Sequence, residues 1–221
     1  MIPVLTIDGP SGVGKGTIAY IMAQKLHWNL LDSGAIYRAF AVAATNREIE
    51  IDNVDDLLKL ASNLDLKFQS DPDQNNLNIY LDNVEISAEL RTEKTAELAS
   101  NYAMIGPLRE SLLLRQQKFK QLPGLVADGR DMGTVVFSDA PFKVFLTADV
   151  EERAKRRLKQ LHDKGIAGNI SHTLEEVQKR DERDANRKHS PLKPAKDALI
   201  IDTTNLTINE VVTKVMALVK A

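Results

Sequence analysis

Residues 9–17 form a glycine-rich segment that could bind phosphate. The segment reads Gly-Pro-Ser-Gly-Val-Gly-Lys-Gly-Thr and lies between an apolar run at residues 3–8 and a helix-length stretch with an apolar face. Glycines let the backbone wrap closely around phosphate oxygens with its N–H groups pointing inward, and Lys15 would reach the outer phosphates as a cation. A glycine-rich turn that merely caps a helix is disfavoured by this context. The predicted nucleotide-binding residues are Gly9, Pro10, Ser11, Gly12, Val13, Gly14, Lys15, Gly16 and Thr17.

Two positions near this segment could help to bind Mg²⁺. Gly16 stands where the commonest phosphate-binding loops have Ser or Thr, so a direct hydroxyl ligand is missing at that position. Thr17 could replace it through its own hydroxyl or through a water. Asp128, at the end of another apolar run, could orient the hydrated ion or simply end its strand. Thr17 and Asp128 are therefore the candidate metal residues.

Further polar groups follow two other apolar runs. Ser33 and Arg38 come after residues 29–32, and Arg130 and Asp131 come after residues 124–128. In a parallel sheet the carboxyl ends of the strands form the ligand crevice, which favours a binding role for these residues. Helix capping by Ser33 and a solvated position for Arg38 remain the structural alternatives.

Arginines are concentrated in residues 151–193, which hold 12 of the 29 basic residues against 8 acidic ones. Helical spacing places Arg153, Arg156 and Arg157 on one face, and a second helix presents a further set. That set is Arg180, Arg183, Asp184 and Arg187. Guanidinium groups suit bidentate contact with phosphate, which we favour over a solvated surface. Aromatic residues are only 5% of the chain, so stacking platforms for nucleic acid are lacking.

The elements that carry these residues alternate between strands and helices, as in an α/β protein with a parallel sheet. We expect five core strands, at residues 3–8, 29–32, 124–128, 142–148 and 198–202. Helices are expected to begin after Gly14, at Ser33, near Asn53, near Thr92, at Pro107, near Asp149, at Thr173 and at Thr207. The last has the capping-box spacing Thr207-x-x-Glu210. Residues 162–173 and 186–197 are expected to be surface loops.

Residues 63–100 interrupt this alternation. Leu64, Leu66 and Phe68 alternate with polar residues, a turn cluster fills residues 71–76, and Leu77, Ile79 and Leu81 alternate again. This pattern predicts a β-hairpin, with Val84 and Ile86 in a short third strand. The stretch is therefore interpreted as a small antiparallel insert.

Composition narrows the class of protein. The 221 residues carry a net charge of -2, so a whole-protein grip on nucleic acid or an anionic membrane is not supported. The absence of cysteine removes disulfides and thiolate sites and fits a reducing compartment. No basic leader and no bilayer-length apolar run are found, so we expect a cytoplasmic protein. The four histidines lack metal-ligand spacing.

Three longer motifs resemble the bacterial cytidylate kinases, within the nucleoside monophosphate kinases. They are Asp-Gly-Pro-Ser-Gly-Val-Gly-Lys-Gly-Thr at residues 8–17, Leu-Leu-Asp-Ser-Gly-Ala-Ile-Tyr-Arg at residues 30–38 and Asp-Gly-Arg-Asp-Met-Gly-Thr-Val-Val at residues 128–136. The resemblance spans nearly the whole chain and includes the insert, Arg109-Glu110 and the Arg180–Arg187 motif. It implies that Ser33, Arg109 and Asp131 face cytosine, that Arg38, Arg130 and Arg187 face the monophosphate, and that Arg180 and Asp184 face the ribose, with Ser100 nearby.

The resemblance implies one P-loop kinase domain, with core residues 1–62, 101–150 and 171–221, an acceptor-side insert at about 63–100 and a helical lid at about 151–170. The expected reaction transfers the γ-phosphoryl group of ATP, with Mg²⁺, to CMP and dCMP, in pyrimidine metabolism. Lys15, Arg130, Arg153 and Arg157 are the candidate catalytic residues. The protein is expected to be a monomer. A P-loop regulatory protein, disfavoured because guanine-reading motifs are missing, and a P-loop small-metabolite kinase remain alternatives.

Overall fold

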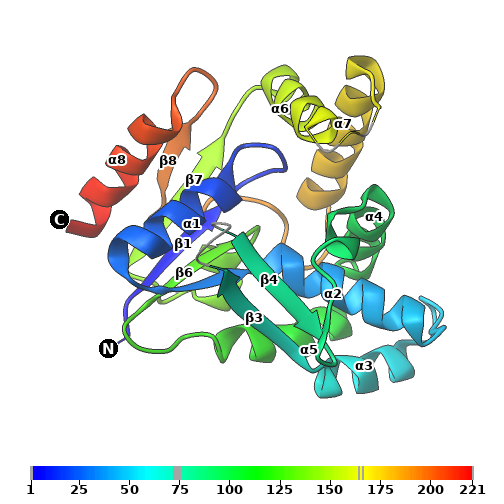
Figure 1. Cartoon of the computed structure of the whole chain (residues 1–221). Coiled ribbons are helices and arrows are strands. Elements are labelled where there is room, and N and C mark those ends of the chain that lie inside the picture. Colours follow the sequence, from blue (N-terminus) through cyan, green and yellow to red (C-terminus); the bar gives the residue numbers. More distant parts are fainter. Residues whose placement is uncertain (1, 72–75, 164, 166, 221) are drawn as a thin grey trace. The chain divides into compact units, whose positions relative to one another are not determined.

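A computed structural model describes residues 2–71, 76–163, 165 and 167–220 (Figure 1). The chain forms two compact units. One consists of Met1–Asp32 with Gln117–Ala221, and the other of Ser33–Gln116. We call them the sheet unit and the helical unit.

The sheet unit is built on five parallel strands in the order β2-β6-β1-β7-β8, which confirms the predicted sheet. The strands are β1 (Val4–Asp8), β2 (Asn29–Asp32), β6 (Leu125–Gly129), β7 (Phe142–Thr147) and β8 (Leu199–Asp202). Two of the three inner strands, β1 and β6, are buried at every residue, as strands of a parallel sheet are when both of their faces are covered. Continuous apolar runs made these strands predictable from sequence.

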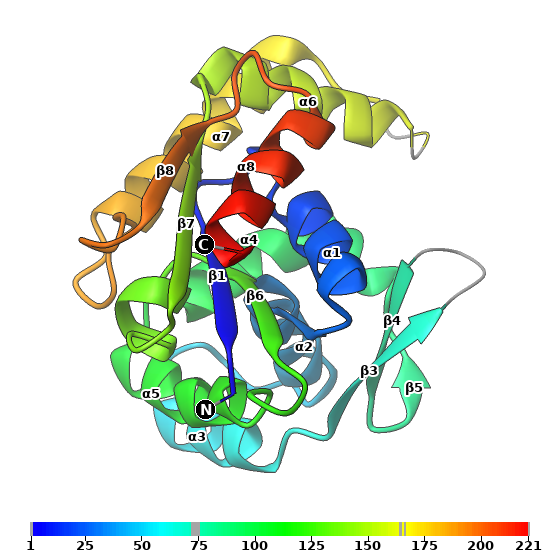
Figure 2. The ribbon, with the colours of Figure 1, turned by 90° about the vertical axis from the view of Figure 1, so that its left-hand side faces the viewer.

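Helices α1 (Lys15–Leu26) and α8 (Ile208–Lys220) pack side by side on one face of this sheet (Figure 2). Their apolar residues, such as Met22 and Val215, join Leu5, Val126 and Val144 of the strands in one core. The predicted capping box begins α8: the Glu210 carboxylate accepts from the Thr207 N–H, and the Glu210 N–H donates to the Thr207 hydroxyl. The core therefore fixes the strand and helix ends at which ligand chemistry is expected.

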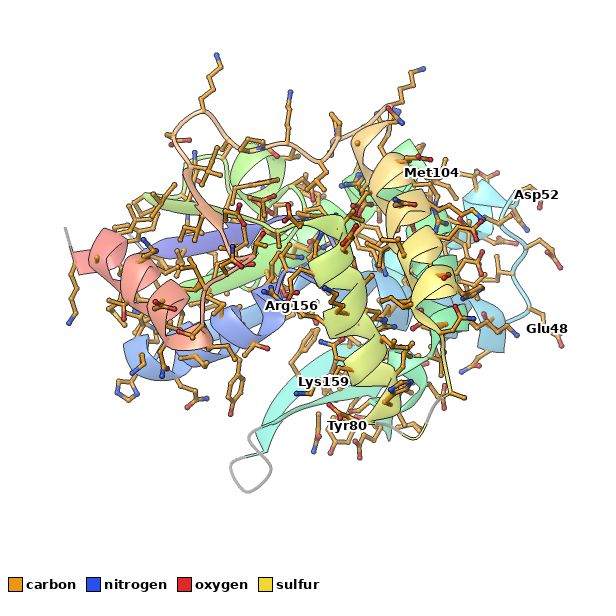
Figure 3. The ribbon with its side chains drawn as sticks, turned by 90° about the horizontal axis from the view of Figure 1, so that it is seen from above. Glu48, Asp52, Tyr80, Met104, Arg156 and Lys159 are labelled. Carbon is orange, nitrogen blue, oxygen red and sulfur yellow. The ribbon has the colours of Figure 1, made fainter. Side chains whose placement is uncertain are left out.

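Helices α6 (Val150–His162) and α7 (Ile170–Ala185) pack against each other in the same unit (Figures 1 and 3). The predicted start of α7 at Thr173 was three residues too late, because the Asn169 side chain caps the helix by accepting from the His172 N–H. The helix ends at Ala185, so Arg187 lies beyond it. The short π-helix η2 (Met132–Val136) follows β6 and was not predicted.

The helical unit contains α2 (Ser33–Asn46), α3 (Val54–Asn63), the 3-10 turn η1 (Glu89–Arg91), α4 (Glu93–Tyr102) and α5 (Gly106–Gln117). Apart from α7, the predicted helices begin within one residue of the expected positions. The predicted hairpin is confirmed as β3 (Leu66–Asp71) and β4 (Asn76–Leu81), with β5 (Val84–Glu85) as the third strand. Residues 72–75 of the expected turn lie outside the described residues. None of the described helices is long and apolar enough to cross a membrane.

Candidate active site

The carboxyl ends of β2, β6 and β1 lie side by side at one edge of the parallel sheet. The register pairs Asp32 of β2 with Asp128 of β6, and Gly129 of β6 with Asp8 of β1. The segments that follow β1 and β6 contain most of the candidate residues in the sheet unit. This edge is where open α/β sheets bind ligands.

The phosphate-binding loop has the backbone that its glycines predict. Gly9, Gly12 and Gly14 have φ angles of 148°, 82° and 93°, values that side chains rarely allow. A Cβ at Gly12 would also lie 3.0 Å from the Arg153 Cβ and 3.1 Å from the Arg153 carbonyl oxygen. Gly14 is the N-cap of α1 and supplies no side-chain acceptor, so the first N–H groups of the helix can serve an anion.

Lys15 is buried at the start of α1. Its Nζ donates to the Pro10 carbonyl oxygen over 2.7 Å, within the loop itself. Burial, followed by the charge of Arg130, lowers the pKa of Lys15 from 10.5 to about 7. A bound polyphosphate would favour the charged amine, so ligand binding and protonation of Lys15 should be coupled.

Asp128 lies beside the first turn of α1. A Cβ at Gly16 would be 3.5 Å from Asp128 Oδ2, so glycine leaves open the space that a Ser or Thr side chain would fill next to this carboxylate. Thr17, the other candidate metal residue, is exposed one position further along. Within the ranges that the structure describes, no three His, Cys, Asp or Glu side chains gather to hold a metal ion. One carboxylate with phosphate oxygens and waters is nevertheless a common Mg²⁺ environment.

Arg130 and Asp184 form a buried ion pair in the sheet unit. Arg130 Nε donates to Asp184 Oδ2 over 2.8 Å. Arg187 approaches the same carboxylate, with 3.9 Å between Nη1 and Oδ1. Burial alone would raise the pKa of Asp184, but the charges of Arg130 and Arg187 outweigh it and hold that pKa below its usual value. Arg180, half-buried on α7, also acts on Lys15 and Asp184 electrostatically.

The three arginines of α6 have different surroundings. Arg153 is buried, donates to the carbonyl oxygens of Ala148 and Ser11, and pairs with Asp181 of α7 at 2.6 Å. It therefore braces the phosphate-binding loop directly.

Arg156, labelled in Figure 3, donates to the carbonyl oxygens of Thr203 and Thr204 and to the Thr203 hydroxyl, so the expected phosphate role does not fit it. Its guanidinium instead ties α6 to the turn after β8. Arg157 is half-buried, and its Nη1 donates to Gln160 Oε1 over 3.4 Å.

Four other candidates lie in the helical unit. The buried Ser33 hydroxyl is the donor to Gln116 Oε1 at 2.6 Å, so its side chain bonds to α5. Arg109 is buried, donates to the Ala103 carbonyl oxygen and stacks over the Tyr37 ring at 5.6 Å. These contacts bring together α2 and α5. Ser100 is buried on α4 and Arg38 is half-buried on α2.

Sequence reasoning missed three residues at these positions. Gln116 and Tyr37 hold Ser33 and Arg109, respectively, and Asp8 accepts from the Met132 and Gly133 N–H groups. Asp8 stands directly before the glycine-rich loop, and a carboxylate ending a buried strand was the signal that could have found it. The other two partners are set by packing between helices.

Comparison with known proteins shows the family of this chain. Residues 5–221 match the cytidylate kinase family model. A cytidylate kinase of Aeromonas salmonicida (strain A449) is 52% identical over 217 residues, covering 98% of this chain and 94% of the relative. One from Shewanella denitrificans is 51% identical, covering 99% and 96%. A gluconokinase structure from Sinorhizobium meliloti 1021 is 14% identical, with a TM-score of 0.46 and coverage of 99% and 91%. The match over nearly the whole length shows that this chain belongs to the cytidylate kinase family.

Proposed function

We propose that this protein transfers the γ-phosphoryl group of ATP to CMP, forming ADP and CDP, and that dCMP is also an acceptor. The observation that carries the proposal is the family match over residues 5–221, together with a phosphate-binding loop whose lysine is buried beside Arg130. The two named relatives are cytidylate kinases, and each matches this chain over nearly its full length.

The donor phosphates are proposed to bind the loop from Gly9 to Thr17. The N-cap of α1 supplies no side-chain acceptor to the first N–H groups of the helix, and Lys15 Nζ lies at the loop, 2.7 Å from the Pro10 carbonyl oxygen. Lys15 would exchange the Pro10 carbonyl for a phosphate oxygen and regain its full charge. Mg²⁺ is proposed to lie by Thr17 and Asp128, through water where necessary, and when bound it neutralises charge on the transferring phosphoryl.

The residues proposed for the acceptor are those that the family resemblance implies. Arg130, Arg38 and Arg187 are proposed to bind the CMP phosphate, because guanidinium groups suit its oxygens. Ser33, Arg109 and Asp131 are proposed to contact cytosine, and Arg180 and Asp184 the ribose, with Ser100 nearby. The ion pair with Asp184 fixes the direction of the Arg130 guanidinium before substrate arrives.

The reaction needs no dedicated general base, because the acceptor is an ionised phosphate oxygen. The protein must hold two polyanions together, align the reacting oxygens and exclude water that would otherwise accept the phosphoryl group. Lys15 and Arg130 are proposed to stabilise charge in the transition state, with Arg153 and Arg157 adding positive charge from α6. Arg153 would act partly by holding Ser11 of the loop in place.

A small-metabolite kinase is the second candidate. An alcohol acceptor would need a carboxylate base, for which Asp32 and Asp131 are the candidates. The extended family match favours a nucleotide acceptor instead, and the same match disfavours a P-loop regulatory protein. Location in the cytoplasm and a monomeric state stay predictions.

The proposal is tested by coupled measurement of ADP release with CMP, dCMP, UMP, AMP and shikimate as acceptors. CMP should be the best of these, because the Asp131 carboxylate can accept from the cytosine amino group and repels the uracil carbonyl. Asp131→Asn should reduce the preference for CMP over UMP by at least about tenfold. Glu175→Gln, an exposed carboxylate of α7, controls for the change in charge. Equal use of UMP and CMP by the wild type would refute the base-reading role of Asp131.

A further inference from the structure

The Asp8 carboxylate bonds to two backbone groups far along the chain. Oδ1 accepts from the Met132 N–H over 2.9 Å, and Oδ2 accepts from the Gly133 N–H over 2.8 Å. Asp8 is 4% exposed. A buried carboxylate is expensive unless its oxygens are bonded, so these two bonds account for its place in the core.

The two N–H groups belong to the first residues of η2, where a helix has no internal partners for its donors. Asp131 is the N-cap residue of η2, yet its side chain makes no capping hydrogen bond. Asp8, at the end of β1, supplies the acceptor instead. The N–H groups at the start of η2 therefore depend on Asp8, and not on the Asp131 side chain, for their acceptor.

Asp8 holds the Arg130–Asp131 segment from both ends. On one side, its backbone is in register with Gly129 through the pairing of β1 with β6. On the other side, its carboxylate binds the N–H groups of Met132 and Gly133. Close packing supports the second attachment: a Cβ at Gly133 would lie 2.8 Å from the Thr6 hydroxyl and 3.3 Å from Asp8 Oδ2.

We propose that Asp8 is a positioning residue for the acceptor nucleotide, since its carboxylate clamps the segment that carries Arg130 and Asp131. The inference rests on the roles proposed above for these two residues. The clamp acts on Arg130 and Asp131 through the backbone and does not touch substrate.

The phosphate-binding loop has supports of its own, although it follows Asp8 directly. Arg153 donates to the Ser11 carbonyl oxygen, and the Thr203 hydroxyl lies within hydrogen-bond distance of the Val13 carbonyl oxygen, at 3.3 Å, as well as of the Thr147 carbonyl oxygen, at 3.1 Å. Strand β1 is also paired with β7 on its other side. Loss of the carboxylate should therefore disturb the acceptor more than the donor.

The test variant is Asp8→Asn. Asn has nearly the shape of Asp, but an NH₂ group replaces one carboxylate oxygen, so one of the two backbone N–H groups would face a donor and lose its acceptor. We expect the KM for CMP to rise about tenfold or more and the KM for ATP to change less than about threefold. Amide exchange of Met132 and Gly133, followed by NMR, should accelerate about tenfold or more relative to amides of β7. Glu175→Gln, the same carboxylate-to-amide change at an exposed position of α7, should leave both readouts near wild type.

Unchanged exchange of the two amides in folded Asp8→Asn would overturn the clamp. Faster exchange with wild-type KM and kcat for CMP would overturn the positioning role, as would equal rises in KM for ATP and CMP. Asp131→Asn, measured alongside, tests the base-reading role of Asp131 separately. That role is judged by the preference for CMP over UMP, whereas the clamp by Asp8 is judged by the exchange of the Met132 and Gly133 amides.

Discussion

Replacing Asp184 by Asn should destabilise the protein, because the change leaves the buried Arg130 without its charged partner. Asp184 and Arg130 are 2.8 Å apart, with side chains only 9% and 19% exposed. Removing one partner of a buried pair costs about 3–5 kcal/mol, and Asn keeps a neutral acceptor, so we expect about 3 kcal/mol. For a chain of this size that free energy lowers Tm by about 6–12 °C.

The assay is thermal unfolding at several pH values, with Glu175→Gln as the control. Glu175 pairs with Lys179 on the same helix α7, but both side chains are more than half exposed, and Tm should move by no more than about 1 °C. Because its neighbours hold the pKa of Asp184 below 3.8, the stabilisation is present at neutral pH and is lost as pH falls through that lowered pKa. The gap between wild type and Asp184→Asn should therefore narrow in acid. A Tm shift as small as that of the control would refute the role of the pair.

Three further substitutions separate catalysis from stability. Lys15→Met should lower kcat about 10²-fold or more, because the transferring phosphoryl group loses a stabilising positive charge. The same change should raise Tm at pH 7, because folding lowers the pKa of this lysine to about 7 and so disfavours its charged form. Near-normal turnover, or a lower Tm, would contradict this reasoning. Arg157→Ala should lower kcat by about tenfold or more with little change in Tm, whereas Arg156→Ala should lower Tm with kcat near wild type, since Arg156 bonds to the turn after β8. Kinetics and thermal unfolding of both variants measure these effects. A lower Tm for Arg157→Ala together with a lower kcat for Arg156→Ala would contradict the roles assigned to the two arginines.

The sequence predicted the elements well where one local signal sufficed. Apolar runs marked the five strands, and capping residues such as Thr207 marked helix starts. The start of α7 was misplaced because two polar residues, Asn169 and Thr173, could both cap a helix. The cap went to Asn169, whose side chain accepts from the His172 N–H.

Side-chain partners were less predictable, because they depend on which distant segments the fold brings together. Helical spacing placed Arg153, Arg156 and Arg157 on one face but could not show that Thr203 lies against Arg156. The bond from Ser33 to Gln116 spans 83 residues, and that from Met132 to Asp8 spans 124. Tertiary packing, rather than residue type, decided which partner each of these side chains contacts.

The buried charges explain why this site is costly without ligand. Folding moves the pKa of Lys15 down to about 7 and that of Asp8 up from 3.8 to about 6, so both side chains are less easily charged than in water. For Asp8 the shift corresponds to about 3 kcal/mol of stability that is present below pH 3.8 and lost as pH rises through about 6. Uncharged side chains at these two positions would avoid this cost in folding free energy. The presence of Lys15 and Asp8 at adjoining loop and strand ends fits a site that gives up stability for function. In the roles proposed here, Lys15 holds phosphate groups and Asp8 holds the segment that contacts the acceptor.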